Sequence, residues 1–102
     1  MAEILDYLKE AVDSQASDLF LVAGGPVSVK QDKQLRPLTE EKIFPQETRR
    51  LIGQLYELAE RSMDDYLRRG DDDFSFSSPG LARFRVNAYR QRGSLAAVVR
   101  VV

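Results

Sequence analysis

The stretch that decides the fold is LARFRVNAYRQRGSLAAVVRVV, residues 81–102. From Leu81 to Arg92, apolar side chains alternate with polar or charged ones, a pattern typical of a β-strand with one buried face. A turn at Gly93-Ser94 is expected to fold the chain back into a second strand from Leu95 to Val102. The strand period of two places Phe84, Val86 and Ala88 on one face, and Arg83, Arg85, Asn87, Tyr89 and Gln91 on the other.

The residues before this hairpin predict three helices and four further strands. Apolar residues recur every three or four positions in 3–14 and again after Pro45, which suits the first position of a helix although Phe44 is a poor N-cap. The expected order is a helix at 3–14, strands at 18–23, 27–30 and 35–38, helices at 45–59 and 60–69, and a strand at 74–76. This order predicts an α+β fold, with an antiparallel sheet packed on one face by helices.

Length and composition exclude several classes of protein. With 102 residues, the chain has the length of one domain. It contains no Cys, His or Trp, which excludes disulfides, thiolate zinc sites and catalysis by an imidazole base. The longest uncharged stretch, Leu19 to Val29, is too short to span a membrane, and the N-terminus lacks the pattern of a signal sequence. We therefore expect a cytoplasmic protein without direct membrane insertion.

Charge is segregated along the chain. The formal net charge is -1, a balance that argues against a nucleic-acid binder. Residues 81–102, however, carry +5 from five arginines, whereas residues 1–80 carry -6. The near-neutral total therefore conceals a basic hairpin joined to an acidic body.

Arg100 is expected on the same face as Arg83 and Arg85, whichever turn the hairpin forms. A Gly93-Ser94 turn places Arg100 opposite Asn87, and an Arg92-Gly93 turn places it opposite Arg85. Neighbouring guanidinium groups repel each other, and each presents a fork of donors that matches a carboxylate or a phosphate. We therefore expect an anion to face this side of the hairpin.

The sequence leaves the nature of that anion open. One candidate is internal, because residues 57–73 are rich in Asp and Glu and carry -4. A phosphate ligand is the second candidate, and nucleic acid is a weaker third. The consecutive acids Asp71, Asp72 and Asp73 do not predict a metal site, because side chains in an extended segment alternate between faces. No pair of carboxylates is typical of an acid–base couple, so no catalytic residue is predicted.

Three stretches together resemble one protein family. They are ASDLFLVAGGP (16–26), DFSF (73–76) and PGLARFRVNAYRQRG (79–93), of which the ARFRVNA run (82–88) is the most specific. In order and spacing they are similar to the N-terminal domain of the type IV pilus retraction ATPases, the PilT-like twitching-motility branch of the type II/IV secretion ATPases. The resemblance extends over nearly the whole chain and implies a PAS-like α+β domain at residues 1–102.

The resemblance also implies a function. In this family, the N-terminal domain precedes a RecA-like motor domain, absent from this chain, and packs on the motor of the neighbouring subunit in a hexamer. Its arginines reach the phosphates of ATP, which is bound with Mg²⁺ by the motor. The matching positions here are Arg83, Arg85 and Arg100, with Arg92 a weaker candidate. The chain is thus expected to be a non-catalytic regulatory and oligomerisation domain without a metal or cofactor of its own. Its implied partners are the motor domains and the inner-membrane pilus platform.

Two departures from the family pattern and two rival functions complete the expectations. Many members have His where this chain has Phe20, which favours a place in the core for that side chain, and Phe44 replaces the usual capping residue type. A stand-alone PAS-like sensor of a small ligand would need polar groups in the core, and the predicted buried stripes are apolar. Within the family, the domain of an accessory retraction, pilus-extension or type II secretion ATPase is the alternative.

Overall fold

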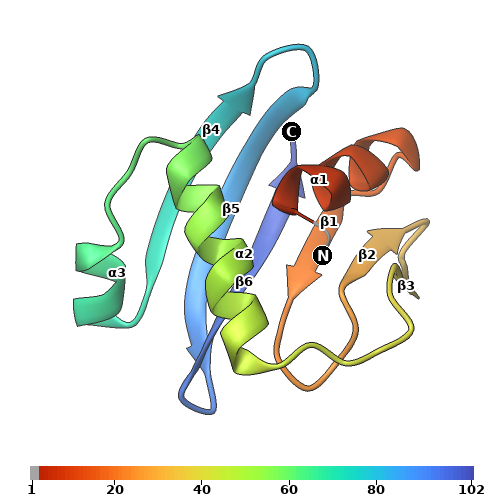
Figure 1. Ribbon diagram of the computed structural model, residues 1–102. Helices are drawn as coiled ribbons and strands as arrows, with labels where there is room; N and C mark the ends of the chain where they lie inside the picture. Colours follow the sequence, from red (N-terminus) through yellow and green to blue (C-terminus); the bar gives the residue numbers. More distant parts are fainter. Residues whose placement is uncertain (1–2) are drawn as a thin grey trace.

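Six antiparallel strands form one sheet in the order β3-β2-β1-β6-β5-β4, so the N- and C-terminal strands β1 and β6 are neighbours at its centre (Figure 1). The computed structural model describes residues 3–102. The strands are β1 (Asp18–Leu21), β2 (Ser28–Gln31), β3 (Gln34–Pro37), β4 (Asp72–Ser78), β5 (Ala82–Gln91) and β6 (Ser94–Val101). Each neighbouring pair except β1 and β6 is joined as a hairpin or loop along the chain.

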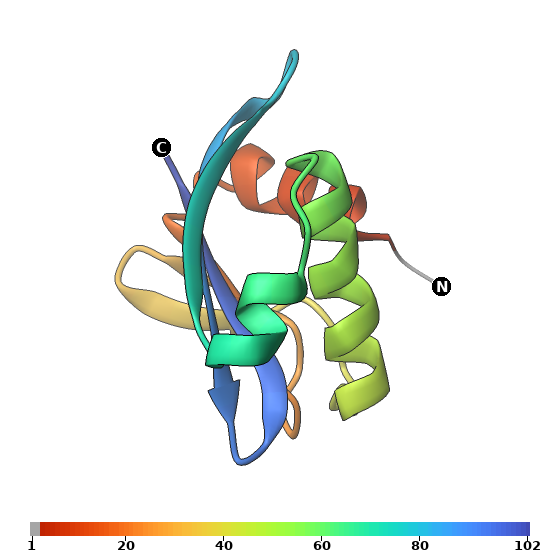
Figure 2. The same cartoon turned by 90° about the vertical axis from the view of Figure 1, so that its left-hand side faces the viewer.

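The three helices lie against one face of this sheet and leave the other face open (Figure 2). They are α1 (Ile4–Asp13), α2 (Pro45–Leu58) and α3 (Asp64–Arg69). Pro45 occupies the start of α2, and Phe44 makes no side-chain capping bond, both as expected. The structure confirms the α+β, PAS-like class, with an antiparallel sheet packed on one face by helices.

The core lies between the helices and the sheet. Strand alternation turns one side of β5 and β6 inward, and the apolar stripes of α1 and α2 meet it. Burying one Leu, Val or Phe side chain stabilises a fold by about 1.5 to 3 kcal/mol, which makes this layer the main source of stability. Its fully buried members include Leu8, Leu19, Leu21, Val29, Leu51, Ile52, Leu55, Phe84, Val86, Ala97 and Val99.

The turn of the β5–β6 hairpin is Arg92-Gly93, one of the two registers that the sequence left open. Gln91 pairs with Ser94, and both turn residues have positive φ, 53° for Arg92 and 82° for Gly93. Positive φ at both turn residues matches the twist of the two strands in a two-residue hairpin. Glycine adopts this conformation without steric cost, whereas a residue with a side chain adopts it less easily. The register places Arg85 directly opposite Arg100.

Two local expectations were wrong. The third helix begins at Asp64, not near residue 60, because Glu60 adopts a positive φ of 53° that ends the preceding helix. Phe20 is only partly buried and lies on the open face, because its neighbours Leu19 and Leu21 take the inward positions of β1. Neither change affects the layer arrangement. Among residues 3–102, no helix is long and apolar enough to cross a membrane.

Candidate functional site

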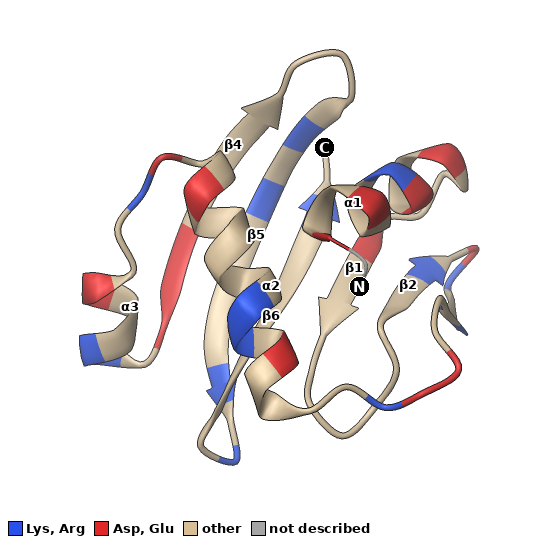
Figure 3. Cartoon of the chain, viewed as in Figure 1, with Lys and Arg blue, Asp and Glu red and all other residues tan. Residues whose placement is uncertain are grey.

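Arg83, Arg85 and Arg100 lie together on the open face of the sheet. Arg83 and Arg85 occupy outward positions of β5, and Arg100 on β6 is the cross-strand partner of Arg85. All three side chains are exposed, and the basic bands on β5 are visible in Figure 3. The predicted face is thus formed as expected, with two guanidinium groups on directly opposed positions.

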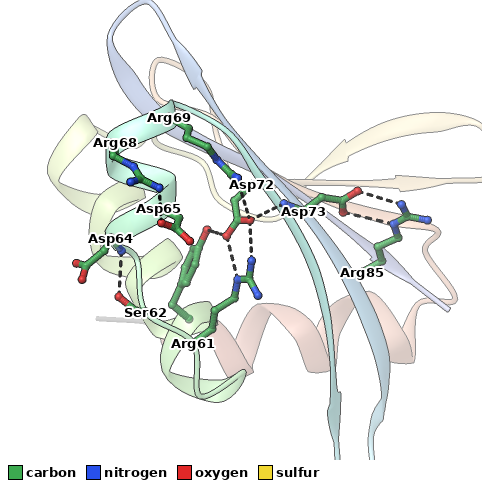
Figure 4. Close-up of polar contacts among 10 residues, drawn as sticks. Arg61, Ser62, Asp64, Asp65, Arg68, Arg69, Asp72, Asp73 and Arg85 are labelled. Atoms are coloured by element: carbon green, nitrogen blue, oxygen red, sulfur yellow. Dashed lines mark hydrogen bonds and ion pairs between the residues drawn. The ribbon is translucent and has the colours of Figure 1, made fainter.

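Two carboxylates flank the opposed pair, one on each side. Arg85 donates to Asp73 on β4 from Nη2 (3.0 Å) and Nε (3.4 Å), a contact drawn in Figure 4. Arg100 donates from Nε to Asp18 on β1 at 3.3 Å. Like charges on opposed strand positions are destabilising, and these two carboxylates offset that repulsion. The group Asp18, Arg100, Arg85 and Asp73, called the charge quartet below, has no formal net charge.

The two ion pairs of the quartet differ in exposure. The side chains of Arg85 and Asp73 are 65% and 50% exposed, whereas that of Asp18 is only 7% exposed. Asp18 also accepts a hydrogen bond from the Ser17 hydroxyl at 2.8 Å. The hydrogen bond from Arg85 holds the pKa of Asp73 below its usual value, so Asp73 is ionised at neutral pH. The Asp73 contact is therefore a surface ion pair, and the Asp18 contact is anchored in the protein.

The quartet lines a shallow hollow of about 430 Å³, together with Asn87 and Val98. In the part of the chain that the structure describes, both terminal nitrogens of Arg100 and Nη1 of Arg85 have no hydrogen-bond partner. Arg83 bonds only neutral groups, the hydroxyls of Ser75 (3.2 Å) and Ser77 (3.4 Å). Donors of three guanidinium groups therefore remain available to an anion, and such groups bind phosphate or carboxylate oxygens.

The structure does not bring Arg92 to this site. Arg92 lies in the β5–β6 turn, seven residues from Arg85, which corresponds to roughly 23 Å along a strand. It borders a different hollow, next to Lys42 and Phe44. Of the four predicted site residues, three are therefore neighbours and Arg92 stands apart.

The remaining arginine of the hairpin has a structural role. Arg90 points to the helix side, where its Nη2 donates to the carbonyl oxygen of Leu67 at 2.8 Å. This bond satisfies a carbonyl near the C-terminal end of α3, where a cation is favourable. Arg90 thus ties α3 to the sheet.

The carboxylates of the acidic segment 57–73 pair with only one of the five arginines in the hairpin, within the described residues. Of these carboxylates within the described residues, Asp73 alone forms an ion pair with an arginine of residues 81–102. Asp72 instead points to the helix side, where Arg61 (2.9 and 3.0 Å) and Arg69 (3.5 Å) donate to it. The opposite directions of Asp72 and Asp73 are those expected for an extended segment (Figure 4).

Asp72 is the centre of a buried polar cluster on the helix side of β4. Its side chain is 2% exposed and also accepts from the Tyr56 hydroxyl (2.8 Å) and the Asp73 backbone N–H (3.0 Å). Hydrogen bonding to Arg61 holds the pKa of Asp72 below its usual value, while burial and the carboxylate raise the pKa of Tyr56. The expectation of uniformly apolar buried stripes was therefore wrong. Every buried side-chain polar atom of residues 3–102 has a partner.

Asp18 is the functional-site residue that sequence analysis missed. The alternation in β1 shows that Asp18 faces away from Leu19, but only the pairing of β1 with β6 places it beside Arg100, 82 residues away. The internal candidate for the anion that faces the arginines was the segment 57–73, because it is dense in acids. The isolated acid in β1 carries no comparable local signal.

The chain is similar to curated ATPases of type IV pili. It is 33% identical to the type IV pilus ATPase PilU of Pseudomonas aeruginosa over 93 residues, which is 91% of this chain and 24% of PilU. It is also 33% identical to the retraction ATPase PilT of the same organism over 101 residues, 98% of this chain and 28% of PilT. The chain therefore spans about a quarter of the length of these relatives. No protein-family model matches it.

Solved structures share the fold. A crystal structure of the pilus retraction motor PilT with bound ADP superposes on the whole chain with a TM-score of 0.85 and 36% identity, and the chain covers 29% of it. The ATPase DotB of Legionella pneumophila matches 97% of the chain with a TM-score of 0.69 and 21% identity, and 27% of DotB is covered. The second similarity concerns the fold alone. The first also extends to the sequence over the full length of the chain.

Proposed function

The chain is an N-terminal domain of the PilT-like ATPases, and we propose that it acts as a regulatory and oligomerisation domain of a hexameric ATPase that powers type IV pilus retraction. In this proposal, the arginines of the open face contact the phosphates of a nucleotide that the RecA-like motor domain binds. By this proposal the chain alone hydrolyses no ATP, because its role is to contact the phosphates of a nucleotide that the motor domain holds. The chain is 33% identical both to PilT and to PilU, so the proposal includes the pilus ATPases of either type.

The observation that carries the proposal is the placement of Arg83, Arg85 and Arg100. Neighbouring strands present the three guanidinium groups on one uncovered face, where Arg85 lines one shallow hollow with Arg100 and a second one with Arg83. Permanently charged, forked donors of this kind stabilise phosphate oxygens and the charge that develops on them during phosphoryl transfer. Because the helices cover only the opposite face, a motor domain has direct access to these donors (Figure 2).

The proposed role implies a nucleotide, a set of protein partners and a location in the cell. In this proposal the nucleotide is ATP, and the motor domain holds both the nucleotide and its Mg²⁺. The partners are the chain's own motor domain, the motor of the adjacent subunit in a homohexamer, and the pilus platform of the inner membrane. We place the protein in the cytoplasm, peripheral at that membrane.

A small-ligand sensor is the less favoured function. The polar groups buried under the helices, such as Asp72 and Tyr56, bond to each other or to neighbouring arginines. A sensor site would instead offer unsatisfied polar groups that converge on an apolar cavity. The described part of the core has no such groups.

The proposal is tested by arginine substitution in the full-length ATPase. Arg85→Ala and Arg100→Ala should each lower kcat at least about tenfold, because a phosphate-contacting arginine contributes most in the transition state. Arg49→Ala, which removes an exposed arginine on α2 across the sheet, is the matched control and should retain activity. Unchanged turnover in both site variants would reduce these arginines to salt-bridge partners. ATP hydrolysis by the 102-residue chain alone would contradict the non-catalytic role.

A further inference from the structure

The charge quartet contains two carboxylates whose relations to their arginines differ. Asp73 occupies Arg85 with two parallel contacts, from Nε and Nη2 to separate oxygens. A phosphate can bind the same edge of a guanidinium group, also through two parallel bonds. Asp73 and an incoming phosphate would therefore compete for the same donors of Arg85.

The exposure of the Arg85–Asp73 pair makes exchange feasible. Half of the Asp73 side chain and about two thirds of the Arg85 side chain are accessible to water. Ion pairs of this kind contribute little net stability, because water solvates both partners well when they separate. The backbone N–H of Asp73 donates to the buried Asp72, which holds this part of β4 in place (Figure 4). The Arg85 side chain is the longer partner and can leave the pair without a change in the backbone.

The Arg100–Asp18 pair has the opposite character. Asp18 is nearly excluded from water, and its second oxygen accepts from Ser17, so its charge requires a cation nearby. Arg100 contacts it through Nε alone, which leaves the two terminal nitrogens directed away from that contact. Asp18 thus holds Arg100 without occupying the outer edge of its guanidinium group.

We propose that Asp73 is an internal substitute for phosphate that occupies Arg85 until a nucleotide phosphate displaces it, whereas Asp18 is a positioning residue that keeps Arg100 ready. The inference rests on the proposed role of this face in phosphate contact. It adds that the site is gated by its own carboxylate, and that Arg85 and Arg100 differ in function although they are cross-strand partners. Arg100 provides the first contact, and Arg85 joins after exchange.

The test is a titration of the 102-residue chain with inorganic tripolyphosphate, followed by calorimetry and by the NMR signals of the arginine Nε–H groups. Asp73→Asn removes the competing charge and should lower the Kd roughly three- to tenfold, the effect of one like charge near an anion at the protein surface. Asp71→Asn is the matched control, because it makes the same change of charge at an exposed position that bonds no arginine within residues 3–102. Asp18→Asn should not tighten binding, because Arg100 loses its anchor.

Each outcome decides between the two proposals. If Asp73→Asn and Asp71→Asn give the same Kd, the exchange is overturned, and it is likewise overturned if Asp18→Asn tightens binding as much as Asp73→Asn. Loss of tripolyphosphate binding in Arg85→Ala and Arg100→Ala would in that case leave the proposed phosphate role standing. If the arginine variants bind as the unmodified chain does, or if no variant binds, the exchange proposal fails, and the phosphate role is decided by the turnover of the full-length arginine variants. Unchanged amide spectra establish that each variant is folded.

Discussion

Asp72 and Asp73 are consecutive residues of β4, and both are bonded through two nitrogens of an arginine, yet they lie on opposite faces of the sheet. Asp72 is covered by α2 and α3 and has four donor groups, from Arg61, Arg69, Tyr56 and the following backbone N–H. The Asp73 side chain faces water, and within residues 3–102 its one partner is Arg85. The same kind of carboxylate–arginine contact thus stabilises the fold on the helix-covered face, whereas on the open face its partner can be exchanged.

The difference follows from burial. A carboxylate removed from water must be compensated by several hydrogen bonds, and breaking those bonds leaves charged or polar groups without solvation. A carboxylate on the surface exchanges its partner for water at little cost. We therefore expect substitutions at Asp72 to change stability, and substitutions at Asp73 to change binding.

The largest effect is expected from Asp72→Ala. The free energy of unfolding should fall by about 2 to 3 kcal/mol, because Tyr56 loses its buried acceptor while Arg61 and Arg69 can still reach water. Urea denaturation monitored by circular dichroism measures this change. Asp71→Ala serves as the control and should stay within about 0.5 kcal/mol. Equal losses in both variants would show that the buried cluster contributes nothing specific.

Lowering the pH is expected to have an intermediate effect on stability, through the protonation of Asp72. The pKa of Asp72 is lower in the folded protein than in the unfolded chain, chiefly through its bonds to Arg61. Its stabilising contribution is therefore complete above the unfolded pKa of about 3.9 and is lost as the pH falls through the lower folded pKa. Urea denaturation at a series of pH values from about 5 to 2 should show stability decreasing more steeply in the unmodified chain than in Asp72→Asn. If the stabilities of the unmodified chain and of Asp72→Asn fall in parallel with pH, Asp72 does not contribute to the loss of stability in acid.

The smallest effect on stability is expected from Asp73→Asn. The urea midpoint should remain unchanged at neutral pH, because the pair with Arg85 is exposed and both groups regain water when it is lost. This measurement complements the titration with tripolyphosphate, in which the same variant should have the largest effect among the three Asp→Asn variants. A clear loss of stability in Asp73→Asn would show that Asp73, like Asp72, stabilises the fold, and would contradict the expected difference between the two residues.

Much of the fold could be predicted from local patterns. The alternation in residues 81–92 and the helical spacing after Pro45 identified their elements correctly, because each element has a continuous apolar face. The beginning of α3 was misplaced, because a single positive φ at Glu60 interrupts residues whose composition suits a helix. The turn register was left open, since Arg92 gives no sign that it adopts the left-handed conformation.

The candidate site could be predicted only in part. Alternation placed Arg83, Arg85 and Arg100 on one face, since both two-residue turns that the sequence offers differ by two positions and keep Arg100 on that face. Their partners could not be derived in the same way. Asp18 reaches Arg100 only through the pairing of β1 with β6, and that pairing joins segments at the two ends of the chain.

The sequence by itself thus determined the class of fold, the basic hairpin and the side of the sheet on which its arginines lie. These features depend on the period of a strand or a helix, which acts over a few residues. Only the tertiary structure decided that Asp18 anchors Arg100, that Asp73 occupies Arg85 and that Asp72 is buried. Strand order and helix coverage set these contacts, because they determine which distant groups meet and which of them keep their water.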